Sequence, residues 1–341
     1  MNPTASRFYG YVFFEKHRET RQSAEEQASV FYEQWVTFSD LEEMPEEKFP
    51  DLQYPDLEII RLAAGQKGLS VCVFTFGHTA ITEIEWEQQD SENPSEFREK
   101  ADRVFEARLR DMSPCECYLG SSRVCFTQSD DPPADAAKEA AIWKTGSAAQ
   151  AEISGCGNLF SLGDHQYMLL SSKADIAENF LNRDFPLMEA AFHKLEFEEG
   201  ELRKLEKQSQ DAKTRVQKLL ARGWDESEPY FNDIRKYQTD LHRIIIRQTG
   251  LRQTLRINID NLRDIGKKYL SSQNDSLFKP MTKRFDGGAT TNMPSTEDDI
   301  RLALMFALAL LVTLVWLFLP GLRKWKFGWK RFIKRKVGTK K

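Results

Sequence analysis

The chain has 341 residues, and its formal net charge of −4 is the difference between an acidic region and a basic one. Residues 1–182 carry 16 Lys and Arg against 32 Asp and Glu, residues 183–271 carry 18 against 15, and residues 321–341 carry ten cations and no acid. Phosphate repulsion by the acidic region argues against nucleic-acid binding there, and 40% apolar residues exclude a wholly disordered chain.

Residues 1–182 are predicted to form an acidic head that mixes strands and helices. Apolar runs of the length and alternation typical of strands occur at residues 8–14, 57–63, 69–76, 80–86, 116–118, 123–128, 158–161 and 166–171. Apolar residues at spacings of three and four predict helices at residues 24–38, 96–110 and 136–143. The elements interleave without the regular alternation of a doubly wound sheet, so we predict an α+β head.

The head contains thiols and an imidazole that allow two chemical interpretations. A metal set can be drawn from Cys115, Cys117, Cys125, Cys156 and His165. These residues lack the paired CxxC spacing of zinc sites, and the alternative is that they are ordinary buried or exposed thiols. A nucleophile at Cys156, with His165 and Asp164 as partners, needs a base beside the sulfur that the spacing does not supply.

No other pattern in the head identifies a reaction. The acids Glu42, Glu43, Glu46 and Glu47 are interpreted as a solvated loop, with cation binding as the alternative. The chain has no P-loop, no GxGxxG and no HExxH. We therefore assign no catalytic, cofactor-binding or metal-binding residue and expect a protein that is not an enzyme and needs no cofactor. Five cysteines without a signal-peptide pattern indicate reduced thiols and a cytosol-facing head.

Residues 183–271 are predicted to form a long antiparallel coiled-coil hairpin. Helical spacing runs over residues 187–222 and 229–271, and glycine, serine and proline between them predict a turn. Polar residues interrupt the apolar stripe at Glu198, Ser209, Gln248 and Asn258; they either fix register where subunits meet or lie at an exposed edge. We expect self-association along a seam formed by Leu195, Leu202, Leu205, Leu241, Ile244, Gln248, Leu251, Leu255, Asn258 and Leu262.

The C-terminal region is predicted to meet a lipid bilayer. Residues 272–300 read as a flexible linker. Residues 301–320 read as a single transmembrane helix, marked by Leu302, Phe306, Leu310, Thr313, Trp316 and Leu319. Residues 321–341 interleave cations with aromatic residues, as amphipathic segments on anionic lipid do; the residues concerned are Arg323, Lys324, Trp325, Lys326, Trp329, Lys330, Arg331, Lys334, Arg335 and Lys336. The alternative for this tail is a disordered basic segment.

The topology of this region is left open by the sequence. The cationic tail favours the cytoplasmic side under the positive-inside rule, which would place the head outside. The missing signal peptide and the unpaired cysteines favour a cytoplasmic head. We expect a cytoplasmic head and leave the side occupied by the tail undecided.

The order of the parts resembles that of CorA-type transporters, with an acidic α/β head, long helices, a membrane segment and a basic end. The resemblance implies a membrane protein that assembles from several copies. That family has two spans joined by a Gly-Met-Asn loop, and here Thr291-Asn292-Met293-Pro294 is not its equivalent. The chain is therefore more similar to CorA-like relatives that have lost transport, including membrane effectors of bacterial conflict systems.

These observations predict a membrane-anchored, homo-oligomeric sensor or effector, and the resemblance implies a role in bacterial defence. Its cytoplasmic head would bind a protein partner or an activating ligand and control the C-terminal membrane-active segment, with no nucleic acid involved. The alternatives are a non-catalytic scaffold that tethers a partner to the membrane, or a CorA-like ion channel or transporter.

Overall fold

The computed structural model describes most of the head and both long helices. The described residues are 6–15, 23–46, 57–66, 68–90, 92–112, 115–129, 150–221 and 228–269. They belong to one unit that spans Met1–Gly288. The predicted helix at 136–143, the turn between the long helices and everything after residue 269 lie outside the described residues.

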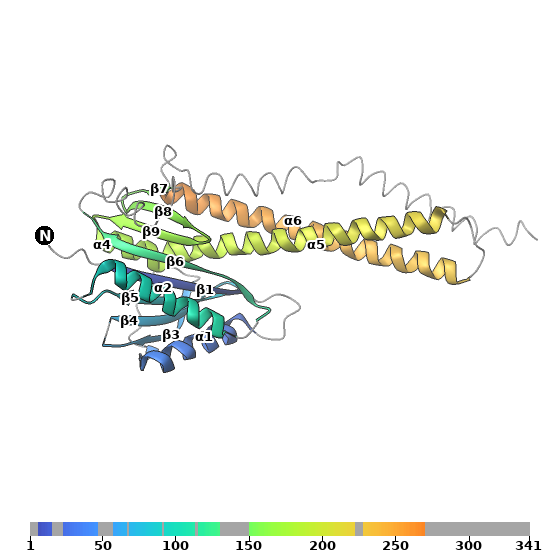
Figure 1. Ribbon diagram of the computed structural model, residues 1–341. Coiled ribbons are helices and arrows are strands. Elements are labelled where there is room, and N and C mark those ends of the chain that lie inside the picture. Colours follow the sequence, from blue (N-terminus) through green and yellow to red (C-terminus); the bar gives the residue numbers. More distant parts are fainter. Residues whose placement is uncertain are drawn as a thin grey trace, which may run out of the picture. The chain divides into compact units, whose positions relative to one another are not determined.

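The described part of the head is built on one nine-stranded sheet, in the order β2-β3-β4-β5-β1-β6-β9-β8-β7 (Figure 1). Neighbouring strands are antiparallel, except for β6 and β9, which are parallel. The strands are β1 (Ser6–Glu15), β2 (Glu42–Glu43), β3 (Leu57–Ala64), β4 (Leu69–Phe76), β5 (Thr79–Glu87), β6 (Tyr118–Gln128), β7 (Gln150–Ile153), β8 (Gly157–Gly163) and β9 (Gln166–Ser171).

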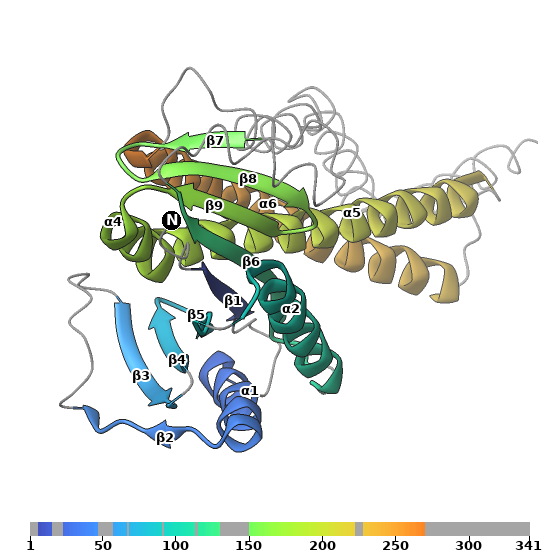
Figure 2. The ribbon, with the colours of Figure 1, turned by 60° about the vertical axis from the view of Figure 1, so that its left-hand side comes forward.

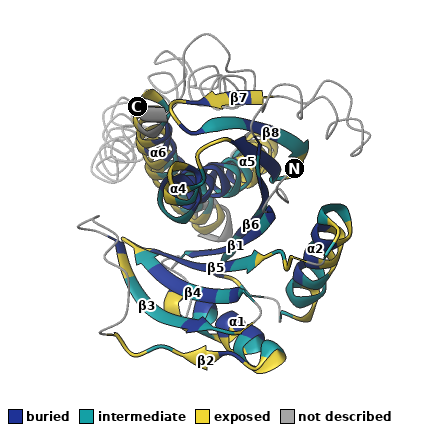
Figure 3. Ribbon diagram, turned by 90° about the vertical axis from the view of Figure 1, so that its left-hand side faces the viewer, coloured by how far each residue is buried: buried dark blue, intermediate teal, exposed yellow. Residues whose placement is uncertain are grey.

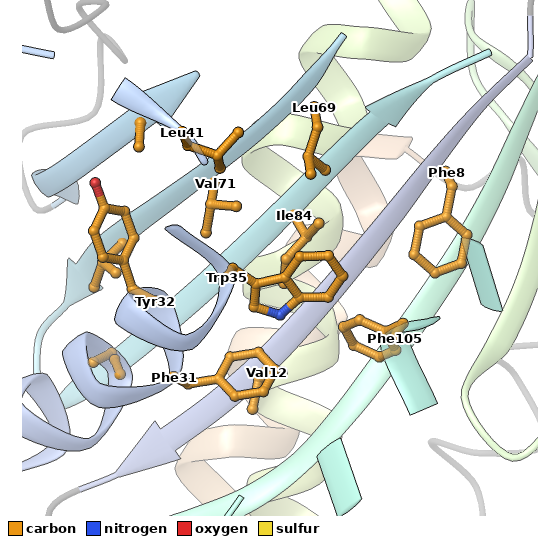
Figure 4. Packing of buried hydrophobic residues seen from close by; sticks show 14 of the residues in the cluster. Phe8, Val12, Phe31, Tyr32, Trp35, Leu41, Leu69, Val71, Ile84 and Phe105 are labelled. Atoms are coloured by element: carbon orange, nitrogen blue, oxygen red, sulfur yellow. The ribbon is translucent and has the colours of Figure 1, made fainter. Parts of the chain in front are cut away.

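One face of the sheet is covered by α1 (Ala24–Ser39) and α2 (Pro94–Asp111). Ser23 begins α1 with a capping box, because its hydroxyl accepts from the Glu26 amide while the Glu26 carboxylate accepts from the Ser23 amide. Between these helices and the sheet lies an apolar core (Figure 4). In it Phe105 packs edge-on against Phe8, and Gly10 admits the ring, since a Cβ there would lie 2.5 Å from Phe105.

The opposite face is covered by α4 (Ala174–Asn179), a π-helical turn η2 (Phe180–Asp184) and the start of α5 (Phe185–Ala221). Figure 2 shows α1 and α4 on opposite sides of the strands, and Figure 3 shows strands β8 and β7 curving round α5. Successive side chains of a strand point to opposite faces. Tyr9, Tyr11 and Phe13 of β1 therefore point towards α5, whereas Phe8 and Val12 point towards α1 and α2.

α5 leaves the head and pairs with α6 (Glu228–Tyr269) to form the helical hairpin (Figure 1). With 37 and 42 residues, the helices are about 55 and 63 Å long at 1.5 Å per residue. Two contacts fix their antiparallel register: Asn258 donates to Glu198 at 3.2 Å, and Arg252 lies 3.6 Å from Glu206.

Most predicted elements of the head correspond to observed ones, but some observed elements were not predicted. These are the strands β2 and β7, the short helix α4 and the π-helical turn η2. Residues 116–118 are not a separate strand, because β6 begins at Tyr118. β2 and β7 are short edge strands, whose weak apolar patterns carry little signal.

The predicted fold class is wrong in one part, the C-terminal transmembrane helix. The structure is α+β, with the nine-stranded sheet and two long packed helices. Among the residues that it describes, however, no helix has the length and apolar character needed to cross a membrane. The single C-terminal transmembrane helix predicted at 301–320 is therefore not part of the described fold. It was inferred from hydropathy alone, and residues 302–319 lie outside the described ranges.

Candidate functional site

The ten residues of the predicted seam lie in α5 and α6. Eight are buried, and Ile244 and Leu251 are half-buried. One chain covers most of this seam with its own two helices, so burial of these residues does not require a second copy. Self-association stays a prediction. The predicted span and tail residues, at 302–319 and 323–336, lie outside the described residues.

The predicted set of thiols and His165 is not brought together as one site. Cys117 and Cys125 lie in the apolar core beneath α1 and α2, and Cys115 packs against that core, with its sulfur accepting from the Cys117 amide at 3.2 Å. Cys156 is buried in the turn before β8, and burial raises the pKa of its thiol to about 12, which disfavours a nucleophilic thiolate. Within the described ranges, the side chains that lie close enough together to hold a metal ion are those of His165, His193 and Glu196. No cysteine is among them.

His165 is aimed at α5 by the tight turn between β8 and β9. Asp164 and His165 both have positive φ, at 40° and 58°, as the two central residues of a tight hairpin turn require. The backbone amide of Arg123 donates to the His165 carbonyl at 2.9 Å, which ties the turn to β6. The turn therefore holds the imidazole at a fixed place beside the helix.

The partners of His165 come from one face of α5. Glu189, His193 and Glu196 follow one another at spacings of four and three, which places them on the same side of a helix. This spacing is the signal that sequence reasoning missed, because residues 187–222 were predicted only as one arm of the hairpin. The helix approaches β6 closely there, and Gly120 makes room: a Cβ on Gly120 would lie 2.2 Å from His193 Nδ1.

Glu189 is the centre of a buried hydrogen-bond network. Its Oε2 accepts from Ser122 Oγ at 2.5 Å and lies 2.8 Å from His165 Nδ1, and its Oε1 accepts from the Tyr167 hydroxyl at 2.8 Å. Ser122 Oγ also lies 2.9 Å from His193 Nε2, and His165 Nε2 lies 3.0 Å from Glu196 Oε2. We name these six residues the His–Glu cluster: Ser122, His165, Tyr167, Glu189, His193 and Glu196.

The pKa values of the two histidines of the His–Glu cluster are shifted in opposite directions. Burial disfavours charge on His165, but hydrogen bonds and the charges of Glu189 and Glu196 outweigh it and raise the pKa of His165 to about 10. Burial and the neighbouring charge of His165 lower the pKa of His193 to about 4. Burial also opposes charge on Glu189, yet the hydrogen bonds and charge of His165 hold the pKa of Glu189 below its usual value. Without a bound ion, the cluster contains one imidazolium and one neutral imidazole, with ring centroids 4.0 Å apart.

A second polar group extends along the same face of the sheet. The Tyr11 hydroxyl donates to the Leu181 carbonyl at 2.9 Å, so it holds the π-helical turn that precedes α5. Opposite Tyr11 in the register, Glu83 is buried, and its Oε2 has no hydrogen-bond partner among the described residues. Burial and the charge of Glu85 raise the pKa of Glu83 well above its ordinary value, so this carboxyl is held neutral.

The chain was also compared with known proteins. No protein-family model matches it, and no curated protein sequence is similar to it. These results do not bear on the resemblance to CorA-type transporters, and the function is argued below from the geometry of the His–Glu cluster.

Proposed function

We propose that this protein is a non-enzymatic sensor or effector in which the α+β head controls the helical hairpin. The observation that supports this is the position of α5. Its first turns lie against β1 and β6, inside the head, and the same helix continues as one arm of the hairpin. Any rearrangement at the sheet is therefore applied directly to the base of the hairpin.

The length of α5 amplifies such a rearrangement. A rigid helix of about 55 Å that tilts by about 10° at its base moves its far end by roughly 10 Å. The base is fixed by a buried polar network rather than by apolar packing alone. Networks of this kind add little net stability but specify one arrangement of the groups that they join. Because such a contact adds little net stability, a ligand or partner that binds at the base shifts it at a small cost in free energy.

The output is proposed to act at an anionic lipid surface, and this part rests on the sequence. Residues 321–341 carry ten cations and no acid, with Trp325, Phe327 and Trp329 between them. Each Lys or Arg near an anionic surface contributes about 1 kcal/mol of attraction, and indole rings favour the headgroup layer. The head's own charge of −16 over residues 1–182 keeps the head away from the same surface.

Hydrogen exchange tests the coupling of head and hairpin. Ser122→Ala removes the hydroxyl that joins Glu189 to His193, and Ser121→Ala is the matched control on the opposite face of β6. We expect Ser122→Ala to speed amide exchange in α5 beyond residue 200 and in α6 at 241–262, and Ser121→Ala to leave both unchanged. If exchange changes only within the head, the two parts act independently and the proposal is wrong.

Dye release from vesicles tests the output. The full chain is added to vesicles with and without anionic lipid, beside a variant in which Lys330, Arg331 and Lys334 are changed to Gln. An effector releases dye from anionic vesicles and loses this activity in the variant. Binding without release identifies the scaffold alternative, and neither binding nor release at low salt rejects a membrane output.

A further inference from the structure

We propose that His165, His193 and Glu196 bind a divalent transition-metal ion of the zinc type where α5 meets the sheet. The three residues come from two places that lie far apart in the sequence, the β8–β9 turn and α5. Ion binding is inferred from the geometry of these residues alone. The further statement, that the ion controls how the head holds the hairpin, rests on the proposed function.

The distances fit an ion after a small adjustment. One ligand atom from each residue lies within 4.8 Å of the other two, and His165 Nε2 is 3.0 Å from Glu196 Oε2. Zinc at about 2.1 Å from nitrogen and oxygen ligands in tetrahedral geometry places those ligands about 3.4 Å apart. His165 and Glu196 are thus close to the required spacing, and the ring of His193 has to approach by roughly 1 Å.

Glu189 occupies the place of a supporting residue behind a metal ligand. Histidine ligands commonly donate their second ring N–H to a carboxylate, which fixes the ring and the tautomer. Glu189 lies 2.8 Å from His165 Nδ1, and this contact leaves Nε2 free to face Glu196 and the ion. Hydrogen bonds from Ser122 and Tyr167 hold Glu189 in turn, so the support is itself fixed.

The charge of the cluster is also matched to a divalent ion. The two carboxylates of Glu189 and Glu196 lie 2.8 Å and 3.0 Å from the two ring nitrogens of His165. Two neutral imidazoles, these two carboxylates and a divalent ion sum to zero.

The donor set selects the class of ion. Two imidazoles with one carboxylate suit zinc and neighbouring transition metals, whereas magnesium and calcium prefer oxygen ligands alone. The site is accessible from one side, since the side chains of His165 and Glu196 are 16% and 36% exposed while that of His193 is 5% exposed. A fourth position stays open to water or to a ligand atom.

Titration of the full chain tests the inference. The chain is stripped with a chelator and titrated with zinc by calorimetry and with cobalt by visible absorption, beside magnesium and calcium. We expect one zinc or cobalt ion per chain and much weaker binding of magnesium and calcium. His165→Gln and Glu196→Gln should each weaken zinc binding at least about 10-fold, because each removes a ligand.

Glu206→Gln is the matched control for Glu196→Gln. Glu206 lies on the same helix with 35% exposure and pairs with Arg252 of α6, away from the cluster. Its variant should bind zinc as the unchanged chain does. The inference is overturned if the folded chain binds no zinc, or if His165→Gln and Glu196→Gln bind it as tightly as Glu206→Gln does.

The outcomes separate this inference from the proposed function. If zinc does not bind while Ser122→Ala still loosens the distant hairpin, only the metal site is wrong. If zinc binds but leaves amide exchange at 241–262 unchanged, the metal site stands and control of the hairpin through it is wrong.

Discussion

One face of the sheet meets α1 and α2 mainly through apolar side chains, whereas the other meets α5 through aromatic rings together with hydroxyls, imidazoles and carboxylates. Phe31, Trp35 and Phe105 are fully buried on the first face. On the second, Ser122 and Glu189 are fully buried and His193 nearly so. Apolar burial stabilises in proportion to area, whatever the detailed fit. Burial of charged groups costs free energy unless each group is paired. The first face therefore supplies stability, and the second specifies one arrangement.

The largest effect is expected on the apolar face. Phe105→Ala leaves a cavity beside Phe8, Gly10 and Trp35, and we expect it to lower the free energy of unfolding by about 3–5 kcal/mol. Urea denaturation followed by circular dichroism measures this loss. The control is Phe38→Ala on α1, whose ring is 49% exposed and should cost less than about 1 kcal/mol. Equal losses would mean that this face is not the main source of stability.

The next effect tests whether the second face is an ionic network. Glu189→Gln keeps the shape but leaves the His165 imidazolium buried beside an uncharged amide, and we expect a loss of about 3 kcal/mol. Tyr167→Phe removes one of several hydrogen bonds to the Glu189 carboxylate and should cost less, about 1.5–2 kcal/mol. Both values come from the same urea titrations. A Glu189→Gln variant as stable as Tyr167→Phe would show that charge contributes nothing there.

The two faces also differ in how far the sequence predicts them. The apolar face follows from local patterns: the helix at 24–38 and the strands at 69–76 and 80–86 were predicted and are observed as α1, β4 and β5. The His–Glu cluster depends on a contact between residues 165 and 193, which no local pattern encodes. His165 was instead grouped with cysteines near it in sequence, which the fold places elsewhere. The spacing of Glu189, His193 and Glu196 can be read from the sequence. Its role is recognised only when the fold places the β8–β9 turn beside these residues.

Glu83 lies on the polar face outside the His–Glu cluster, and its substitution is expected to increase the free energy of unfolding. Because burial raises the pKa of Glu83, the folded protein binds this proton more tightly than the unfolded chain, whose pKa is about 4.3. The resulting stability is fully present below that value and is lost as pH rises through the folded pKa. Glu83→Gln has no titratable group at this position, so the variant should be more stable than the unchanged protein at pH 8 and about equally stable near pH 4.

Unfolding titrations across pH measure this difference, with Glu87→Gln as the control. Glu87 lies on the same strand but is exposed and paired with Arg7. Its variant should show no gain at high pH. A Glu83→Gln variant that is less stable than the unchanged protein at pH 8 would mean that the Glu83 carboxylate is stabilised by a partner.

The smallest effect asks whether the polar character of the second face continues into the hairpin. Glu198 lies in the α5–α6 seam with Asn258 as its hydrogen-bond partner, and burial raises the pKa of Glu198 to about 7 although that hydrogen bond opposes the shift. Its contribution is therefore present at low pH and is lost between about pH 4.3 and 7. After correction for intrinsic rates, amide exchange at 241–262 should then quicken as pH rises from about 4.3 to 7 and should level off above that. In Glu198→Gln this dependence should vanish. If it persists, the opening is controlled from the His–Glu cluster rather than from the seam, and the hairpin's polar positions serve only register.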